Sequence, residues 1–364
     1  MIRTAFKSAT LLAGLMLLAS SVLHAEHRPS RPSVTTYASG LSSPRGLTFG
    51  PDRNLYVAEA GIGGDLVPRD DAGCPAMVNI YSPYTAGFTG RVIRVRPNGR
   101  KDVVADNLPS MTDNSGASYG PTDVAFVGNA LYVLIEMGGC SHALPDNPAA
   151  VLRVNRDGST TPVADLSAWH AANPSNFIKD TDPATTDQEP GGVFHSMTAI
   201  GKYLYVIETN RGFVLRVDPR TGVIEKLYDM SIDNREHNPI VMTQRGRNFF
   251  VGTFGEDGGP SELAVFDKHF SSYTLPFKTS NPLVGLAWKC DDLYGVEIFP
   301  LNDPWVGPAN LVRFDRRTGK RTAVLTGFAN LPNGLIEGPD GALYTSNWGI
   351  SFAPGDGGVL RIKL

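Results

Sequence analysis

One unit recurs six times along this 364-residue chain, and the recurrence restricts the fold more than any other feature of the sequence. In every copy an apolar segment, a tight turn and a second apolar segment follow one another. The copies read GLTFGPDRNLYVAEA, DVAFVGNALYVLIE, SMTAIGKYLYVIET, IVMTQRGRNFFVGT, GLAWKCDDLYGVEI and GLIEGPDGALYTSN. Short apolar runs bounded by turn residues are typical of β-strands. Each copy therefore predicts a pair of strands, A and B.

A second pair of strands follows each copy. The clearest examples read GRVIRVRPNGRKDVVADNL, AVLRVNRDGSTTPVADL, FVLRVDPRTGVIEKLYDM and NLVRFDRRTGKRTAVLTGF. Asn, Asp and Gly in the central turns supply the backbone angles that a hairpin needs. A repeating unit of four antiparallel strands, A to D, is typical of a β-propeller blade. The sequence therefore predicts an all-β fold.

The two ends of the chain complement each other. The last copy stops after its third strand, GGVLRIKL (357–364), while SVTTYASGL (33–41) resembles the fourth strands of the other copies. We expect the N-terminal strand to complete the last blade, because closing the ring removes two free sheet edges. The sequence thus predicts one six-bladed β-propeller over residues 33–364.

The first residues have the pattern of a secretory signal peptide, which we assign to 1–25. Arg3 and Lys7 precede an apolar run that ends in LHAE, with a small residue before the expected cleavage near Ala25. A short linker, 26–32, would follow, and an uncleaved membrane anchor is the alternative. The apolar run is shorter than the ~20 residues of a spanning helix, and no second candidate follows. We therefore expect a secreted or periplasmic protein with no membrane span after cleavage.

The charge balance restricts the choice of partners. The chain has 33 basic and 36 acidic residues, and loss of Arg3 and Lys7 leaves 31 basic residues against the same 36 acidic ones. A mildly acidic surface lacks the basic footprint of a nucleic-acid-binding protein. We therefore expect no nucleic acid partner, and we expect a monomer.

The strand order divides the loops between two faces. Turns A–B and C–D are minimal and lie on one face, whereas connections B–C and D–A emerge on the other. The long connections are 61–90, 138–150, 167–193, 298–309 and 348–358. Long loops in a compact domain commonly serve binding. We expect a small molecule or a protein to bind on this long-loop face, over the central channel.

Two of the three cysteines lie on that face. Cys74 and Cys140 fall in the B–C loops of neighbouring blades. In an exported protein such a pair predicts a disulfide, with two unpaired thiols as the alternative. Cys290 lies in a short A–B turn on the opposite face, where we expect a free, partly buried thiol.

Four polar residues stand at the start of strand A in different copies: Arg45, Asp123, His195 and Asn333. These positions should face the channel mouth, so they predict a mixed-charge binding rim suited to an anionic or hydroxylated ligand. His195 is a candidate general base, since histidine titrates near neutral pH. We favour a structural role for it, because the sequence shows no carboxylate partner.

A second polar set marks the end of strand B. It comprises Glu59, Glu136, Glu208, Thr253, Glu297 and Asn347, with Glu136 one residue out of phase. Carboxylates around a channel mouth are potential ligands of Ca²⁺, which takes several oxygen ligands. The same side chains can instead satisfy backbone groups of the blade turns, and we favour that role for most of them. No cofactor is therefore assigned firmly, and Ca²⁺ or another divalent metal stays open.

Several ordered motifs together resemble the ScyD/ScyE family over essentially the whole mature chain. They are ASGLSSPRGLTFGPDRNLYVAEAGIGGD, a Cys-bearing loop that runs to GFTGRVIRV, then EPGGVFHSMTAI and NRGFVLRVDPRTG. The resemblance implies an exported six-bladed, NHL-like propeller with no settled catalytic activity. We therefore favour a binding module over an enzyme.

The chain is also similar, more distantly, to enzymes of the same architecture. Gluconolactonase-like propellers hold a central divalent metal, and Glu59, Glu208, Glu297 and Asn347 are the positions that could imitate its ligands. SPRGLTFGPDRNLYVAEA is similar to the opening of quinone-dependent sugar dehydrogenases. The alternative function is thus a divalent-metal-dependent hydrolase, lactonase or lyase at the channel mouth, with His195 as acid and base.

Overall fold

The computed structural model describes residues 31–69, 71, 78–175, 186, 188–233, 235–255, 261–279, 281–298, 308–350 and 353–364. Pro32–Leu364 form one compact unit, and the fold below is that of this unit. The expected signal peptide, Cys74 and most of the expected linker lie outside the described residues. Among the residues that are described, no helix is long and apolar enough to cross a membrane.

Six sheets of antiparallel strands make up the described part of the unit, one for each predicted blade. The first three blades contain β2 (Pro44–Phe49), β3 (Leu55–Glu59), β4 (Thr85–Val95), β5 (Lys101–Thr112) and β6 (Ser118–Tyr119); β7 (Pro121–Val127), β8 (Ala130–Ile135), β9 (Ala150–Val154) and β10 (Thr160–Asp165); and β11 (Phe194–Ile200), β12 (Tyr203–Glu208), β13 (Phe213–Val217) and β14 (Ile224–Asp229). The next two contain β15 (Pro239–Arg245), β16 (Asn248–Thr253), β17 (Glu262–Phe266) and β18 (Tyr273–Lys278); and β19 (Leu283–Lys289), β20 (Asp292–Glu297), β21 (Pro308–Phe314) and β22 (Arg321–Asn330). The sixth contains β23 (Ile336–Glu337), β24 (Leu343–Asn347), β25 (Gly357–Lys363) and β1 (Ser33–Leu41). Short helices are α1 (Leu166–Ala172), η1 (Cys140–His142) and η2 (Met230–Asp233).

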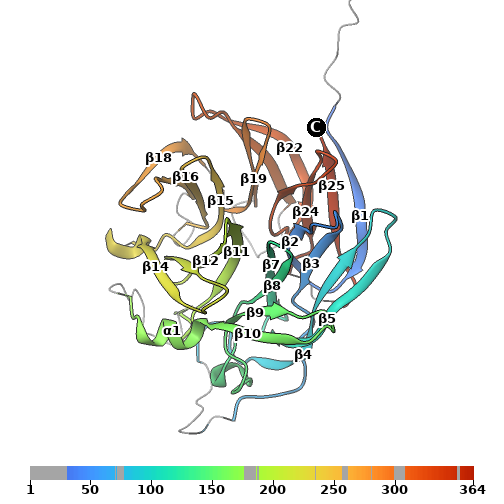
Figure 1. Ribbon diagram of the computed structural model, residues 1–364, viewed down its shortest axis with the longest axis vertical. Coiled ribbons are helices and arrows are strands. Elements are labelled where there is room, and N and C mark those ends of the chain that lie inside the picture. The colour runs from blue at the N-terminus through green and yellow to red at the C-terminus, as the bar shows by residue number, and fades with distance from the viewer. Residues whose placement is uncertain are drawn as a thin grey trace, which may run out of the picture. The chain divides into compact units, whose positions relative to one another are not determined.

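The N-terminal strand closes the ring as the sequence predicts. β1 pairs antiparallel with β25, from Ser33 opposite Lys363 to Leu41 opposite Gly357. Figure 1 shows the blue β1 beside the red β25, and β2, β7, β11, β15 and β19 nearest the centre. The prediction of a six-bladed β-propeller is confirmed.

The repeated Gly-Pro-Asp and Leu-Tyr elements have a structural explanation. In the sixth blade, Asp340 of the A–B turn accepts hydrogen bonds from Tyr344 Oη at 3.0 Å and from Arg361 Nε at 2.8 Å. A side chain on Gly338 would place its Cβ 2.4 Å from the Tyr344 ring, so the turn requires glycine there. Tyr56 and Asp52 make the same contact in the first blade, at 3.0 Å. The Gly-Pro-Asp and Leu-Tyr elements of the first and sixth blades therefore stabilise the A–B hairpin turns of these blades.

Aromatic side chains join neighbouring blades. Phe49 meets Tyr344 edge-on, with ring centroids 5.0 Å apart, and Tyr56 meets Phe126 at 4.9 Å. Such pairs add roughly 0.5–1.5 kcal/mol each beyond the area they bury. The tyrosines of strand B thus contribute both to their own turn and to the packing of blade on blade.

The cysteines are only partly described. Cys290 is a free thiol, as predicted, but it is exposed and not partly buried. It has a positive φ of 53° in the tight turn between β19 and β20, which holds it away from the core. Because Cys74 lies outside the described residues, its disulfide with Cys140 stays a prediction.

Candidate functional site

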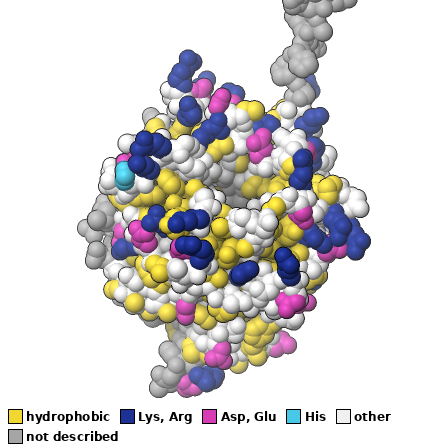
Figure 2. Space-filling model, viewed as in Figure 1, with side chains coloured by type: hydrophobic (Ala, Val, Ile, Leu, Met, Phe, Trp, Pro, Cys, Tyr) yellow, Lys and Arg dark blue, Asp and Glu magenta, His cyan; other side chains and the backbone are white. Residues whose placement is uncertain are grey.

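The inner strands of all six blades surround a central cavity of about 460 Å³. Figure 2 shows the propeller hollowed at the centre of its ring. Small residues on the inner strands, among them Gly46, Ala125, Ala199 and Ala287, line the cavity and leave this space open. The volume lies in the range of small-molecule sites.

Asp123 is the ionisable side chain at one end of this cavity. Its Oδ1 accepts the backbone N–H of Val124 at 2.8 Å, and its Oδ2 accepts that of Met197 at 2.9 Å. Burial nevertheless raises the pKa of Asp123 to about 7, because desolvation outweighs these two hydrogen bonds. A carboxyl group that titrates near neutral pH in a cavity is a feature of functional sites.

Other polar groups also line the cavity, and two of them have no protein partner among the described residues. The buried Ser196 Oγ and Trp288 Nε1 atoms have no hydrogen-bond partner within the described part of the chain. Glu337 is the other ionisable residue of the lining, and it lies 3.5 Å from the ammonium of Lys289. A buried donor or acceptor without a partner costs about 1–3 kcal/mol of stability. The Ser196 Oγ and Trp288 Nε1 atoms are therefore available to a ligand or to water.

A chain of four polar side chains lies at the ends of the inner strands. Arg45 Nη2 is 2.5 Å from Glu136 Oε2, and Glu136 Oε1 is 3.1 Å from His195 Nδ1. Asn333 Nδ2 is 3.1 Å from His195 Nε2. Both ring nitrogens of His195 therefore face a side-chain partner, Nδ1 facing Glu136 and Nε2 facing Asn333.

This chain of contacts changes the prediction for the rim. Arg45, His195 and Asn333 do come together, and Asp123 and Asn333 line the cavity. The side chain of Arg45 is only 2% exposed and is neutralised by Glu136, so it does not offer a charge to an anionic ligand. The expectation of an anionic ligand loses the support of Arg45, and ligand binding at the rim stays a prediction.

Glu136 is the residue that joins the predicted ones, and it also supplies the carboxylate partner that His195 was expected to lack. Burial alone would raise the pKa of Glu136, but Arg45 and His195 outweigh it and hold the pKa below its ordinary value. The sequence signal that could have identified Glu136 was its position at the end of strand B, because it is one residue out of phase with the corresponding residues of the other copies.

The four candidate metal ligands lie in four separate blades, and each of them already contacts other groups of the protein. Glu59 accepts the backbone N–H of Ser42 at 2.8 Å and lies 3.0 Å from Arg91 Nε. Burial raises the pKa of Glu59, against the opposing effects of these two partners. Asn347 Oδ1 accepts the backbone N–H of Asn330 at 2.7 Å.

The other two candidates are engaged in the same way. Glu208 accepts the backbone N–H groups of Val193 at 3.3 Å and Arg211 at 2.9 Å. Glu297 forms a two-point ion pair with Arg321, whose Nε lies 2.7 Å from Oε1. In the described residues, no three His, Cys, Asp or Glu side chains are grouped so that they could hold a metal ion. These contacts support the structural role that the sequence favoured.

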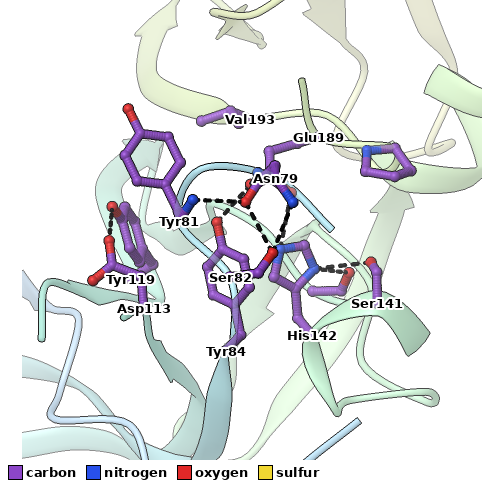
Figure 3. Close-up of polar contacts among 12 residues, drawn as sticks. Asn79, Tyr81, Ser82, Tyr84, Asp113, Tyr119, Ser141, His142, Glu189 and Val193 are labelled. Carbon is purple, nitrogen blue, oxygen red and sulfur yellow. Dashed lines mark hydrogen bonds and ion pairs between the residues drawn. The ribbon is translucent and has the colours of Figure 1, made fainter. Parts of the chain in front are cut away.

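A second polar cluster lies in the long loops (Figure 3). Glu189 accepts hydrogen bonds from Tyr84 Oη at 2.7 Å and from Asn79 Nδ2 at 3.0 Å. Its other oxygen is 3.0 Å from His142 Nε2, and His142 Nδ1 faces the carbonyl of Gly138 at 3.1 Å. The cluster joins the long loops of the first two blades to the loop that enters the third.

A further pair of polar residues lies between the loop cluster and the linked side chains of Arg45, Glu136, His195 and Asn333. Tyr119 donates its hydroxyl hydrogen to Asp113 at 3.0 Å, and the guanidinium of Arg45 lies 5.8 Å from the centre of the Tyr119 ring. Tyr119 of β6 thus lies beside Arg45 and contributes to the burial of its guanidinium.

Comparison with known proteins supports the fold. No family model and no curated protein matches the sequence. A putative oxidoreductase (glucose dehydrogenase) from Thermus thermophilus is similar in structure, with a TM-score of 0.54, 16% sequence identity, and coverage of 91% of this chain and 100% of that chain. A structure described as glucose dehydrogenase has a TM-score of 0.53 at 13% identity and covers 91% of this chain and 99% of its own. At these identities the similarity concerns the propeller fold.

Proposed function

We propose that this protein is an exported binding module of the ScyD/ScyE kind that holds a small molecule in its central channel. The observation that carries the proposal is the cavity of about 460 Å³ with Asp123, Ser196 and Asn333 at its lining. A cavity of this size that combines apolar side chains with a few convergent polar groups is suited to a small molecule. Export follows from the signal-peptide pattern of the sequence.

The alternative of a metal-dependent hydrolase, lactonase or lyase receives less support from the contacts. The carboxylates that would have to bind the metal already accept backbone N–H groups or pair with arginine. His195 has both ring nitrogens engaged, Nδ1 with Glu136 and Nε2 with Asn333. A general base needs a free lone pair within reach of a substrate proton. The binding module is therefore the function that we propose.

The test is to fill the channel. Ala199 lines the cavity, so Ala199→Phe reduces its volume, whereas Val103→Phe adds the same ring at an exposed position outside it. Both variants and the wild type are screened by thermal shift against amines, alcohols, sugars and carboxylates of fragment size. We expect compounds that stabilise the wild type and Val103→Phe but not Ala199→Phe. Stabilisation that survives in Ala199→Phe would place binding elsewhere and overturn the proposal.

A further inference from the structure

We infer that the channel ligand is a small, largely apolar amine whose ammonium group binds at Asp123. The inference rests on the proposed function and specifies the class of ligand. Its first support is the charge of the cavity, because Lys, Arg and His are absent from the described lining. Asp123 and Glu337 are the ionisable groups there, and Glu337 already has Lys289 beside it.

Asp123 has no basic partner within the described residues. Arg45 and His195 are the basic residues of the predicted binding rim, and both contact Glu136 instead of Asp123. Buried carboxylates are normally paired with a cation, since an unpaired one loses its hydration without compensation. The missing counter-ion is what a cationic ligand would supply. The two backbone N–H groups on Asp123 fix the orientation of the carboxylate without neutralising it.

Three acceptors lie in the same part of the cavity. Ser196 immediately precedes Met197, whose N–H bonds to Asp123, and the buried side-chain oxygen of Ser196 has no partner among the residues that the structure describes. Asn333 gives its Nδ2 to His195, and its Oδ1 accepts no hydrogen bond in the described part of the chain. A primary ammonium has three N–H donors, so carboxylate, hydroxyl and amide oxygen together match its needs.

Glycines bring these acceptors close to one another. A Cβ on Gly46 would lie 2.0 Å from Asp123 Oδ1, so the carboxylate sits directly against the backbone of the neighbouring strand. A Cβ on Gly334, next to Asn333, would lie 3.6 Å from the Cα of Gly46. The inner strands of the first, second and sixth blades therefore meet around Asp123.

The remainder of the lining offers surface to the body of an organic cation. Apolar side chains contribute part of this surface, and hydroxyl and amide side chains contribute the rest: Leu47, Val124, Met242, Val284, Leu286 and Leu335, with Thr48, Thr198, Thr243 and Gln244. Ca²⁺ takes six to eight oxygen ligands, and among the described residues no three His, Cys, Asp or Glu side chains are grouped to hold a metal ion. An amine with an apolar body would bury that body against the apolar side chains while its ammonium reaches Asp123.

Three probes of similar size and different charge test the inference: 2-phenylethylammonium, 2-phenylethanol and phenylacetate. Binding to the full mature protein is measured by calorimetry at pH 8, with CaCl₂ as a fourth arm. We expect the ammonium to bind roughly 30-fold more tightly than the alcohol, because a desolvated charge pair contributes at least about 2 kcal/mol. Phenylacetate should bind most weakly, and Ca²⁺ should not compete.

Variants identify the residue responsible. Asp123→Asn should abolish the preference for the ammonium while leaving the alcohol bound, and Ser196→Ala should weaken the ammonium by a smaller factor. Asp157→Asn, in an exposed hairpin turn, is the matched control and should change nothing. Equal binding of alcohol and ammonium, or competition by Ca²⁺, would overturn the amine but keep the channel as a binding site. Failure of all three probes to bind would count against the proposed function itself.

Discussion

Replacing Asp123 by asparagine should change how the stability of the protein depends on pH. The pKa of Asp123 rises from 3.8 to about 7 in the folded protein because its carboxyl is desolvated. The folded state therefore binds this proton more tightly than the unfolded state does. Stability is higher when the group is protonated, and it falls as pH rises from about 4 to about 7. The full cost of ionising the group is roughly 4 kcal/mol, since one pKa unit corresponds to about 1.4 kcal/mol.

Asparagine removes this pH dependence at a constant cost. Both carboxyl oxygens of Asp123 accept a backbone N–H, from Val124 and from Met197, and an amide can accept only one of these. The lost acceptor should cost about 1–3 kcal/mol at every pH. The variant should therefore gain about 2–3 kcal/mol relative to the wild type between pH 5 and pH 8.

Urea unfolding at both pH values, at fixed ionic strength, measures this difference. Groups that titrate in both proteins cancel in the comparison. Asp157→Asn is the control, because the hydrogen bonds from Ser159 lower the pKa of Asp157. That control should show no gain at high pH. A stability difference for Asp123→Asn that is the same at pH 5 and pH 8 would refute the argument that the carboxyl is desolvated.

Three further changes test the contacts that support the site. Glu136→Gln leaves the guanidinium of Arg45 buried without a counter-charge, so urea unfolding should show that the free energy of unfolding falls by about 3–5 kcal/mol. The double variant Arg45→Met/Glu136→Gln should lose less stability, and an equal or larger loss in the double variant would contradict this reasoning. Glu208→Gln should lower the melting temperature equally in Ca²⁺ and in chelator, because its partners are two backbone N–H groups and the ring of His170; a shift seen only with Ca²⁺ would favour the metal site. Deletion of 33–41 exposes the edge of β25 and should abolish cooperative unfolding followed by circular dichroism; an unchanged transition would show that ring closure is dispensable.

The sequence contains enough information for the fold because the repeat specifies it at several levels. Alternating apolar segments give the strands, and turn residues such as Asp340 give the hairpins. The absent fourth strand of the last copy gives the closure through β1. All three signals are local in sequence or complementary between the two ends, so they can be recognised without coordinates.

The candidate site was predicted less completely because backbone irregularities determine it. The pairing of β7 with β8 shifts between Pro121 and Asp123, and that of β11 with β12 shifts between Phe194 and Ser196. A β-bulge of this kind changes which side chains face the channel, and alternation of residue types does not reveal it. In these registers Asp123 corresponds to Ser196, which also lines the cavity, whereas His195 corresponds to Thr122. Asp123 therefore lies one residue further along its strand than the comparison of the repeats with His195 assumed.

The departure of the second blade from the repeat indicates where function was added to the scaffold. Glu59, Glu208 and Asn347 each accept a backbone N–H from the segment before the inner strand of their own blade. Glu136 instead links Arg45 of the first blade to His195 of the third. A residue released from the repeated structural contact can take a new partner without cost to the other blades. Asp123 belongs to the same blade, and its desolvated carboxyl destabilises the fold when it ionises. Selection for stability alone would not maintain such a group, so a ligand that compensates its charge is the simplest physical reason for it.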